Sequence, residues 1–371
     1  MSIGQLVPYV DLAGQHAPIK AEVLAAVERV LDSGRFILGD EVEQFEREFA
    51  ALCGCDYAIG VNSGTDALVL SLRALDIGAG DEVITVPNSF VSSTSCIELI
   101  GAKPVFVDVR DDMNIDPELI EAAITPRTKA ILVVHLTGRP APMDRVMEVS
   151  RRHGLRVVED AAQAVGARFQ DRPAGSFGDI GCFSLHPLKT LNACGDGGVL
   201  TTSSPELHKR LLRLRNIGLR TRDDASEWSG NSRLDTMQAA ILLVKLRHLH
   251  AWTAQRRENA RFYQETLKDV VRVPVDGPGE CAVYHTFVVQ TERRDGLKAH
   301  LADAGVGSAI HYPIPIHLTT IGRSLGYREG SFPVTERLAR EILSLPVHQD
   351  LTKAQLAQVV EGVRDFYQEA R

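Results

Sequence analysis

The chain has 371 residues, of which 44% are hydrophobic and 24% charged, and its formal net charge is −7. This composition is typical of a globular protein large enough for two packed domains, and the acidic balance argues against a nucleic-acid-binding surface. Because we find no apolar run near the ~20 residues that cross a bilayer, no signal peptide, and six scattered cysteines, we expect a cytoplasmic protein that does not bind membranes.

The first part of the chain is predicted to be helical, and an alternation of strands and helices follows. Apolar residues recur three and four positions apart over 17–53, with a glycine-bounded break at 33–40. From residue 58, short runs rich in valine and isoleucine alternate with helical stretches. Continuous apolar runs are typical of strands buried on both faces, so this alternation predicts a mostly parallel α/β sheet. The predicted strands are 58–61, 82–86, 103–109, 130–135 and 156–160.

The last third of the chain has a different pattern. A long helix is predicted to begin near Asp235, in a position to bridge two domains. A strand at 283–290, a helix at 295–305 and an amphipathic helix at 352–370 are predicted beyond it. We therefore predict a large domain at 1–250 and a small domain at 251–371, with the first ~30 residues as a candidate to pack on the small domain.

The segment NSGTDAL, residues 62–68, follows a short strand and begins a helix. Ser63, Gly64 and Thr65 lie at its first turn, where backbone N–H groups lack intrahelical partners and bind anions such as phosphate. A serine cap with Asp66 at the positive end of the helix explains the same residues. The chain lacks the Walker sequence and the GxGxxG fingerprint, which makes a nucleotide-dependent oxidoreductase a distant alternative.

A carboxylate pair and a lysine come next. The strand 156–160 ends in Glu159 and Asp160, whose side chains must point to opposite faces, and ligands bind at this end of strands in open α/β sheets. A carboxylate there can equally cap the following helix. Lys189 lies in SLHPLKTLNACGDGG, residues 184–198, where Pro187 and the glycines allow tight turns. A lysine desolvated between buried strands has a lowered pKa and offers a neutral amine for a Schiff base.

These features together suit pyridoxal phosphate (PLP). Its phosphate needs a helix N-terminus, its ring nitrogen an anionic partner and its aldehyde a lysine amine. Phe90, in VPNSFVSST at 86–94, offers a face for the ring, although an ordinary core aromatic fits that position too. The prediction rests on the conjunction of these motifs in this order.

The same residues carry a resemblance that runs almost from end to end. The chain resembles the DegT/DnrJ/EryC1/StrS family of PLP-dependent sugar aminotransferases. The family's motifs correspond, in order, to SGRFILGDEVEQFEREFA, GVNSGTDAL, VPNSFVSST, VVHLTGRPAPMD, EDAAQAVGA, FSLHPLKTLNACGDGG, GNSRLDTMQAAI and HYPIPIHL. The resemblance implies a fold-type-I PLP-dependent transferase, in which helices flank a mostly parallel mixed sheet in the large domain and the C-terminal domain is smaller and α+β.

The resemblance also implies roles for individual residues. Lys189 would bind the cofactor covalently and act as general acid and base, and Asp160 would pair with the pyridinium nitrogen. Asn231 would reach the phosphate of a second subunit, which implies a homodimer with shared active sites, although a plain turn residue fits there as well. The other cofactor residues would be Gly64, Thr65, Phe90, Gln163 and Ser184.

Three residues around the lysine depart from the family's usual HPTKNLGAxGDGG. They are Leu188, Thr190 and Asn192, whereas the lysine, Pro187 and GDGG are kept. We expect the chemistry to be retained, whereas the effect of these three residues on the hydrogen bonds next to the cofactor is left open. Because some relatives that replace the lysine with histidine catalyse a dehydration, the lysine favours transamination here.

The resemblance implies a ping-pong transfer of an amino group from glutamate or glutamine to a nucleotide-linked keto-deoxysugar. HYPIPIHL, residues 311–318, favours C3 as the aminated carbon. His311, Tyr312, His317 and Arg220 are candidates for substrate contacts, although a rigid segment and a surface ion pair would explain them too. The histidine spacing does not fit zinc, so no metal is expected. Alternatives left open are amination at C4, a keto-inositol acceptor and a non-catalytic regulator with this fold.

Overall fold

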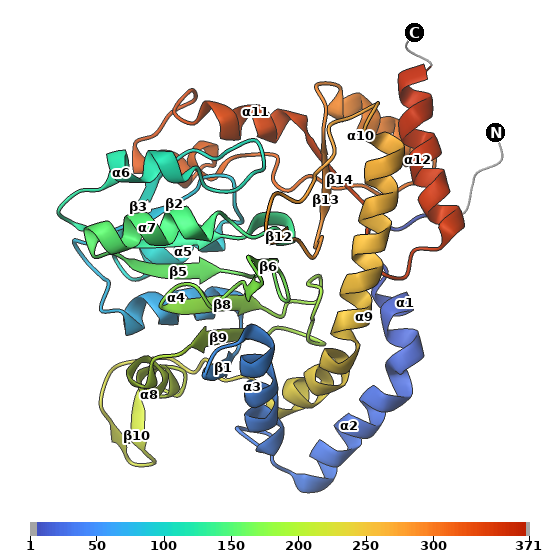
Figure 1. Ribbon diagram of the computed structural model, residues 1–371. Coiled ribbons are helices and arrows are strands. Elements are labelled where there is room, and N and C mark those ends of the chain that lie inside the picture. The colour runs from blue at the N-terminus through green and yellow to red at the C-terminus, as the bar shows by residue number, and fades with distance from the viewer. Residues whose placement is uncertain (1–5, 369–371) are drawn as a thin grey trace.

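The computed structural model describes residues 6–368, and a seven-stranded sheet in the order β1-β9-β8-β5-β4-β2-β3 crosses the larger part (Figure 1). β9 runs antiparallel to both neighbours, whereas the strands from β8 to β3 pair in parallel. The prediction of a mostly parallel mixed sheet is therefore confirmed. The strands are β1 (Tyr57–Val61), β2 (Glu82–Thr85), β3 (Lys103–Phe106), β4 (Thr128–Val134), β5 (Arg156–Asp160), β8 (Ile180–Ser184) and β9 (Gly198–Thr202).

Helices cover both faces of this sheet (Figure 1). The connections through α4 and α5 lead towards β3 at one edge of the sheet, whereas the connection through α7 leads back from β4 to β5. Because such crossovers are right-handed, α7 lies on the face of the sheet opposite to α4 and α5. Adjacent strand residues accordingly enter different apolar clusters, as Cys182 and Phe183 do in β8. The helices of this part are α3 (Asp40–Cys53), α4 (Gly64–Ala74), α5 (Ser92–Leu99), α6 (Ile120–Ala123), α7 (Met143–His153) and α8 (Pro205–Leu214), with the short helices η2 (Pro117–Leu119) and η3 (Leu136–Gly138).

The long helix α9 (Thr236–Leu267) connects the sheet to a second core, in which its Tyr263 and Leu267 are buried. Around that core lie β13 (Phe287–Gln290), β14 (Ile342–Leu345), α10 (Arg294–Asp303) and α12 (Lys353–Gln368). The helix α11 (Pro333–Glu341) instead packs on the core of the large sheet, through Leu338. The predicted strand at 283–290 is shorter than expected, because the left-handed backbone of Tyr284, at φ 49°, interrupts it. The predicted boundary near residue 250 falls inside α9, so the domain limits stay a prediction.

The N-terminal segment follows α9 from one core to the other (Figure 1). Val7 forms a bridge with Val306 and is buried in the second core, whereas Val30 of α2 packs on Val244 of α9. No helix within residues 6–368 combines the length and apolar character needed to cross a membrane. The remaining elements are α1 (Leu12–His16), η1 (Ala17–Ile19), α2 (Lys20–Ser33), β6 (Arg168–Phe169), β7 (Arg172–Pro173), β10 (Leu219–Thr221), β11 (Asp224–Ala225), β12 (Glu280–Cys281), η4 (Ile316–Leu318) and η5 (Gly322–Leu325).

Candidate active site

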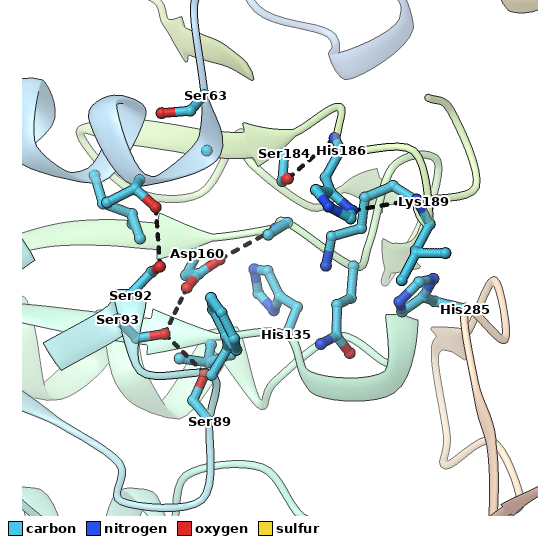
Figure 2. A pocket seen from close by; sticks show the side chains of 18 of the residues that line it. Ser63, Ser89, Ser92, Ser93, His135, Asp160, Ser184, His186, Lys189 and His285 are labelled. Carbon is cyan, nitrogen blue, oxygen red and sulfur yellow. Dashed lines mark hydrogen bonds between the residues drawn. The ribbon is translucent and has the colours of Figure 1, made fainter. Parts of the chain in front are cut away.

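A cavity of about 310 Å³ lies at the carboxyl ends of β5 and β8, where open α/β sheets bind ligands (Figure 2). Its walls come from the N-terminus of α4, the loop after β2, the loop after β8 and the segment 311–312. The structure thus brings together most of the residues that the sequence predicted: Gly64, Thr65, Phe90, Asp160, Gln163, Ser184, Lys189, His311 and Tyr312.

One end of the cavity is the first turn of α4. The Ser63 hydroxyl accepts a hydrogen bond from the backbone N–H of Asp66 at 3.0 Å and caps the helix. The Asp66 carboxylate is turned away and accepts a hydrogen bond from the Ser232 hydroxyl, so it does not occupy the helix end. As the first residues of α4, Gly64 and Thr65 keep backbone N–H groups without intrahelical partners, which is the arrangement that binds anions.

Two glycines allow the strand ends to approach this turn. A Cβ atom on Gly64 would lie 2.6 Å from the Ser184 Cβ, and one on Gly198 would lie 2.3 Å from the Ser63 carbonyl oxygen. The Ser184 hydroxyl is thereby brought beside the free N–H groups. The close approach therefore creates a cradle of donors that fits a phosphate group.

Asp160 ends β5, is buried and lines the cavity next to Ser93 (Figure 2). Its carboxylate accepts hydrogen bonds from the Ser93 hydroxyl at 2.7 Å and from the Ala162 N–H at 3.2 Å, and Ser93 is bonded to the Ser89 hydroxyl at 2.7 Å. Burial raises the pKa of Asp160, while these hydrogen bonds and the charge of Lys189 oppose the rise. A cation held against this carboxylate would stabilise its charged form further.

Lys189 extends into the same cavity from the loop after β8 (Figure 2). Loss of hydration lowers the pKa of its amine to about 8, and the nearby Asp160 carboxylate only partly opposes this shift. Roughly a tenth of Lys189 is therefore a neutral amine at pH 7, far more than for an ordinary lysine, and this form serves nucleophilic and proton-transfer roles.

The loop departures lie mostly behind the cavity rather than in it. Leu188 lines the cavity and is half exposed, whereas Thr190 and Asn192 are buried. The Asn192 amide donates to the Lys189 carbonyl at 2.8 Å, and the buried Lys245 ammonium donates to the Asn192 carbonyl at 2.8 Å and side-chain oxygen at 2.5 Å. Asn192 thus supports the backbone of Lys189 from behind the cavity, and neither Thr190 nor Asn192 lines the cavity itself.

Glu159 is a supporting residue to which the sequence analysis gave an orientation but no role. It points to the other side of β5 from Asp160, is fully buried, and accepts hydrogen bonds from His135 Nε2 at 2.9 Å and from the backbone N–H groups of Gly175, Phe177 and Gly178 at 2.6–2.7 Å. His135 lines the cavity, so Glu159 fixes part of its wall. Strand alternation predicted the opposite orientation of the two carboxylates, but the partners come from distant segments.

Another wall of the cavity brings together Phe90, Gln163 and Tyr312, which are far apart in the chain. Gln163 accepts a hydrogen bond from the Thr137 N–H at 2.7 Å and lies 3.4 Å from the Tyr312 hydroxyl. The Phe90 ring, 53% exposed, lies 5.9 Å from the Tyr312 ring. Burial raises the pKa of Tyr312 to about 12 and lowers that of His311 to about 4, so both are neutral at pH 7.

Three predicted residues lie outside the cavity of their own chain. His317 is fully buried and bonded to Glu336 at 3.0 Å, so its assignment as a substrate residue is corrected: no surface remains for a ligand. Arg220 lies on the β10–β11 hairpin and pairs with Asp224 at 2.6 Å, and Asn231 is exposed nearby. Within residues 6–368, no cluster of three or more His, Cys, Asp or Glu side chains could hold a metal ion.

Comparison with known proteins yields one family. The model of the DegT/DnrJ/EryC1/StrS aminotransferase family matches residues 17–364. The dTDP-3-amino-3,4,6-trideoxy-alpha-D-glucose transaminase of Streptomyces venezuelae is 46% identical over 97% of this chain and 96% of its own length. The UDP-N-acetyl-3-dehydro-alpha-D-glucosamine 3-aminotransferase of Acidithiobacillus ferrooxidans is 44% identical over 98% and 99%. The crystal structure of S. venezuelae DesV with a ketimine intermediate superposes with a TM-score of 0.95, at 46% identity, covering 97% of this chain and 98% of that one.

Proposed function

The chain belongs to the DegT/DnrJ/EryC1/StrS aminotransferase family, and from this premise we propose that it transfers an amino group from glutamate or glutamine to C3 of a nucleotide-linked keto-deoxysugar in amino-sugar biosynthesis. The observation that carries the proposal is one cavity that joins the Lys189 amine, the Asp160 carboxylate and the first turn of α4. Two similar relatives are named for the amination of C3, one on a dTDP-linked and one on a UDP-linked sugar, which supports the choice of carbon.

The residues of the cavity fit PLP. The N–H groups of Gly64 and Thr65 would hold its phosphate together with the Ser184 hydroxyl, in the cradle that a Cβ on Gly64 would fill. Asp160 would pair with its protonated ring nitrogen, and Lys189 would bind it through the amine. The bound cofactor supplies an electron sink that allows a Cα–H bond of an amino acid to break.

Side chains of this protein would transfer the proton and position the reactants. Lys189 Nζ, with a pKa of about 8, can take the proton from Cα of the donor and return it later to the carbon that becomes aminated. Phe90 would cover the face of the ring, and Gln163 would hold Tyr312 against the substrate side. Because one lysine serves both halves of the reaction, donor and acceptor would use the site in turn, as a ping-pong sequence requires.

We also propose a homodimer in which Asn231 completes the phosphate site of the partner subunit. Asn231 is exposed and lies outside its own cavity, and Trp228 on the same segment is 94% exposed, as a contact surface for a second subunit would require. If sites are shared, mixing inactive K189A and N231A chains creates dimers with one intact site and restores activity. Activity that stays at the level of the separate variants would contradict sharing of the sites between subunits.

The free cysteines of residues 6–368 suit a cytoplasmic location.

The function is tested most simply in reverse. The purified protein is given 2-oxoglutarate or 2-oxoglutaramate, the keto acids of the two donors, with nucleotide-linked 3-amino sugars, nucleotide-linked 4-amino sugars or an amino-inositol. Formation of glutamate or glutamine is measured, and we expect it only with 3-amino sugars. A preference for 4-amino sugars would indicate C4, and a preference for the amino-inositol would indicate a keto-inositol acceptor. No product with either keto acid and any amino compound would favour a non-catalytic regulator.

A further inference from the structure

A second cavity, of about 330 Å³, adjoins the candidate active site on the side of the small domain. Three residues, Leu188, His285 and His311, line both cavities. Figure 2 shows His285 beside Lys189, so the second cavity begins at the residues that surround the lysine amine. The other residues that line it are Tyr9, Val10, Arg256, Thr286, Val347 and His348.

Arg256 of α9 places a buried cation in this cavity. The side chain is 8% exposed; its Nε donates to the Gln349 side chain at 3.1 Å, and its Nη1 lies 3.4 Å from the backbone carbonyls of Tyr284 and His285. None of these contacts uses Nη2, and within residues 6–368 no carboxylate forms an ion pair with the guanidinium; Asp350 acts on it only from further away. Burial lowers the pKa of Arg256 to about 10, so it stays charged at neutral pH.

Three further residues that line this cavity carry polar atoms without partners. Within residues 6–368, His285 Nδ1, Thr286 Oγ1 and His348 Nδ1 are buried and make no hydrogen bond. Buried polar atoms are paired in most proteins, and a buried cation without an anion is costly. Their concentration around one cavity therefore indicates a site shaped for a polar, negatively charged ligand.

His285 connects this site to the lysine. Its backbone carbonyl lies 3.4 Å from Arg256 Nη1, and its ring lies beside Lys189 (Figure 2), so His285 stands between the two cations. Burial lowers the pKa of His285 far below its ordinary value, which keeps the ring neutral. An anionic group bound at Arg256 would therefore leave the rest of a small ligand directed towards Lys189. Half-exposed Leu188 and buried Val347 offer apolar contacts for a short carbon chain.

We propose that this second cavity binds a carboxylate of the amino donor, with Arg256 as the group that recognises it. The inference rests on the proposed aminotransferase function. A planar guanidinium matches the geometry and single charge of a carboxylate, whereas the diphosphate of a nucleotide carries more negative charge and would need further cations. Arg256 would thereby orient the donor so that its amino group meets the site of Lys189.

The test compares R256Q and R256K with R294Q. Arg294 is a matched control, because it is also 8% exposed and binds the backbone carbonyls of Ala339 and Ile342 away from both cavities. Glutarate, a dicarboxylate that cannot react, is titrated into each PLP-loaded protein by calorimetry. The two half-reactions are followed separately by cofactor absorbance, with glutamate for one and the amino sugar for the other.

We expect R256Q to weaken glutarate binding and raise the half-saturating glutamate concentration by about tenfold or more, since a charged hydrogen-bonding partner is lost. R256K should fall between R256Q and the wild type, and R294Q should change neither value. The half-reaction with the amino sugar should stay within about twofold in R256Q.

Three outcomes would overturn the subsite. One is unchanged glutarate binding in R256Q. Another is equal impairment of the half-reactions with glutamate and with the amino sugar, which would indicate that Arg256 binds the nucleotide diphosphate instead. If R256Q does not fold, failure of glutarate to compete with glutamate in the wild type also overturns it. A wild-type protein that transfers no amino group would instead refute the proposed function, which separates the two failures.

Discussion

Replacing Glu159 tests whether this buried carboxylate stabilises the wall of the cavity. Its carboxylate is buried beneath the cavity, with each oxygen accepting two hydrogen bonds: Oε1 from the N–H groups of Phe177 and Gly178, and Oε2 from Gly175 and His135. Glu159→Gln keeps the size of the side chain and replaces one acceptor oxygen by an NH₂ donor. Whichever way the amide is placed, two donors then face another donor.

His135 cannot relieve this conflict by moving its proton. The Ala141 N–H donates to His135 Nδ1 at 3.0 Å, so Nε2 must carry the hydrogen that Glu159 accepts. Two buried hydrogen bonds are therefore lost, and at about 1–3 kcal/mol for each unsatisfied buried group the free energy of unfolding should fall by about 2–6 kcal/mol.

Urea unfolding of the wild type and Glu159→Gln, followed by circular dichroism, measures this loss. Glu148→Gln is the control, because Glu148 forms an exposed ion pair with Arg145 at 2.6 Å and should cost less than about 1 kcal/mol. A loss below about 1 kcal/mol for Glu159→Gln would refute the view that this carboxylate holds the wall of the cavity.

Three further predictions concern the cradle and the lysine loop. Gly198→Ala would place a Cβ 2.3 Å from the Ser63 carbonyl oxygen, so PLP affinity, measured by absorbance titration, should fall by about tenfold or more, and unchanged affinity would exclude the cradle. Lys245→Met leaves two oxygens of Asn192 unpaired and should lower the free energy of unfolding by about 2–4 kcal/mol in urea; faster hydrogen exchange limited to the lysine loop should accompany it. In PLP-free protein, acetylation of Lys189 should reach half its maximal rate near pH 8, because burial lowers its pKa and the neutral amine accumulates above that pH; a midpoint near the ordinary value of about 10.4 would contradict this.

The sequence predicted the sheet, and it also pointed to the residues that the structure gathers in one cavity, because both follow from local patterns and motifs. Buried parallel strands leave continuous apolar runs, and the order of Asp160 and Lys189 after the NSGTDAL turn specifies which strand ends meet. The opposite orientation of Glu159 and Asp160 followed from strand alternation alone. These predictions needed no knowledge of contacts between distant segments.

The supporting residues were missed because their partners are distant in the chain. Nothing local indicates that Lys245 reaches back to Asn192, or that Glu336 encloses His317 and removes it from the substrate. Arg256 lies in a helix whose exposed arginines look the same in sequence, and it is distinguished only by the cavity into which its guanidinium points. Whether a charged side chain is buried depends on how the folded chain packs, and the local sequence pattern does not show it.

Borohydride reduction of the PLP-loaded protein, followed by peptide mapping, tests the role of Lys189 most directly. We expect the reduced cofactor on Lys189 alone, with Lys245, buried behind the same loop, unlabelled. Prior addition of glutamate should abolish the label, because the donor takes the place of the lysine amine. A label on another lysine, or none in a protein that binds PLP, would contradict the assignment of Lys189 as the residue that carries the cofactor.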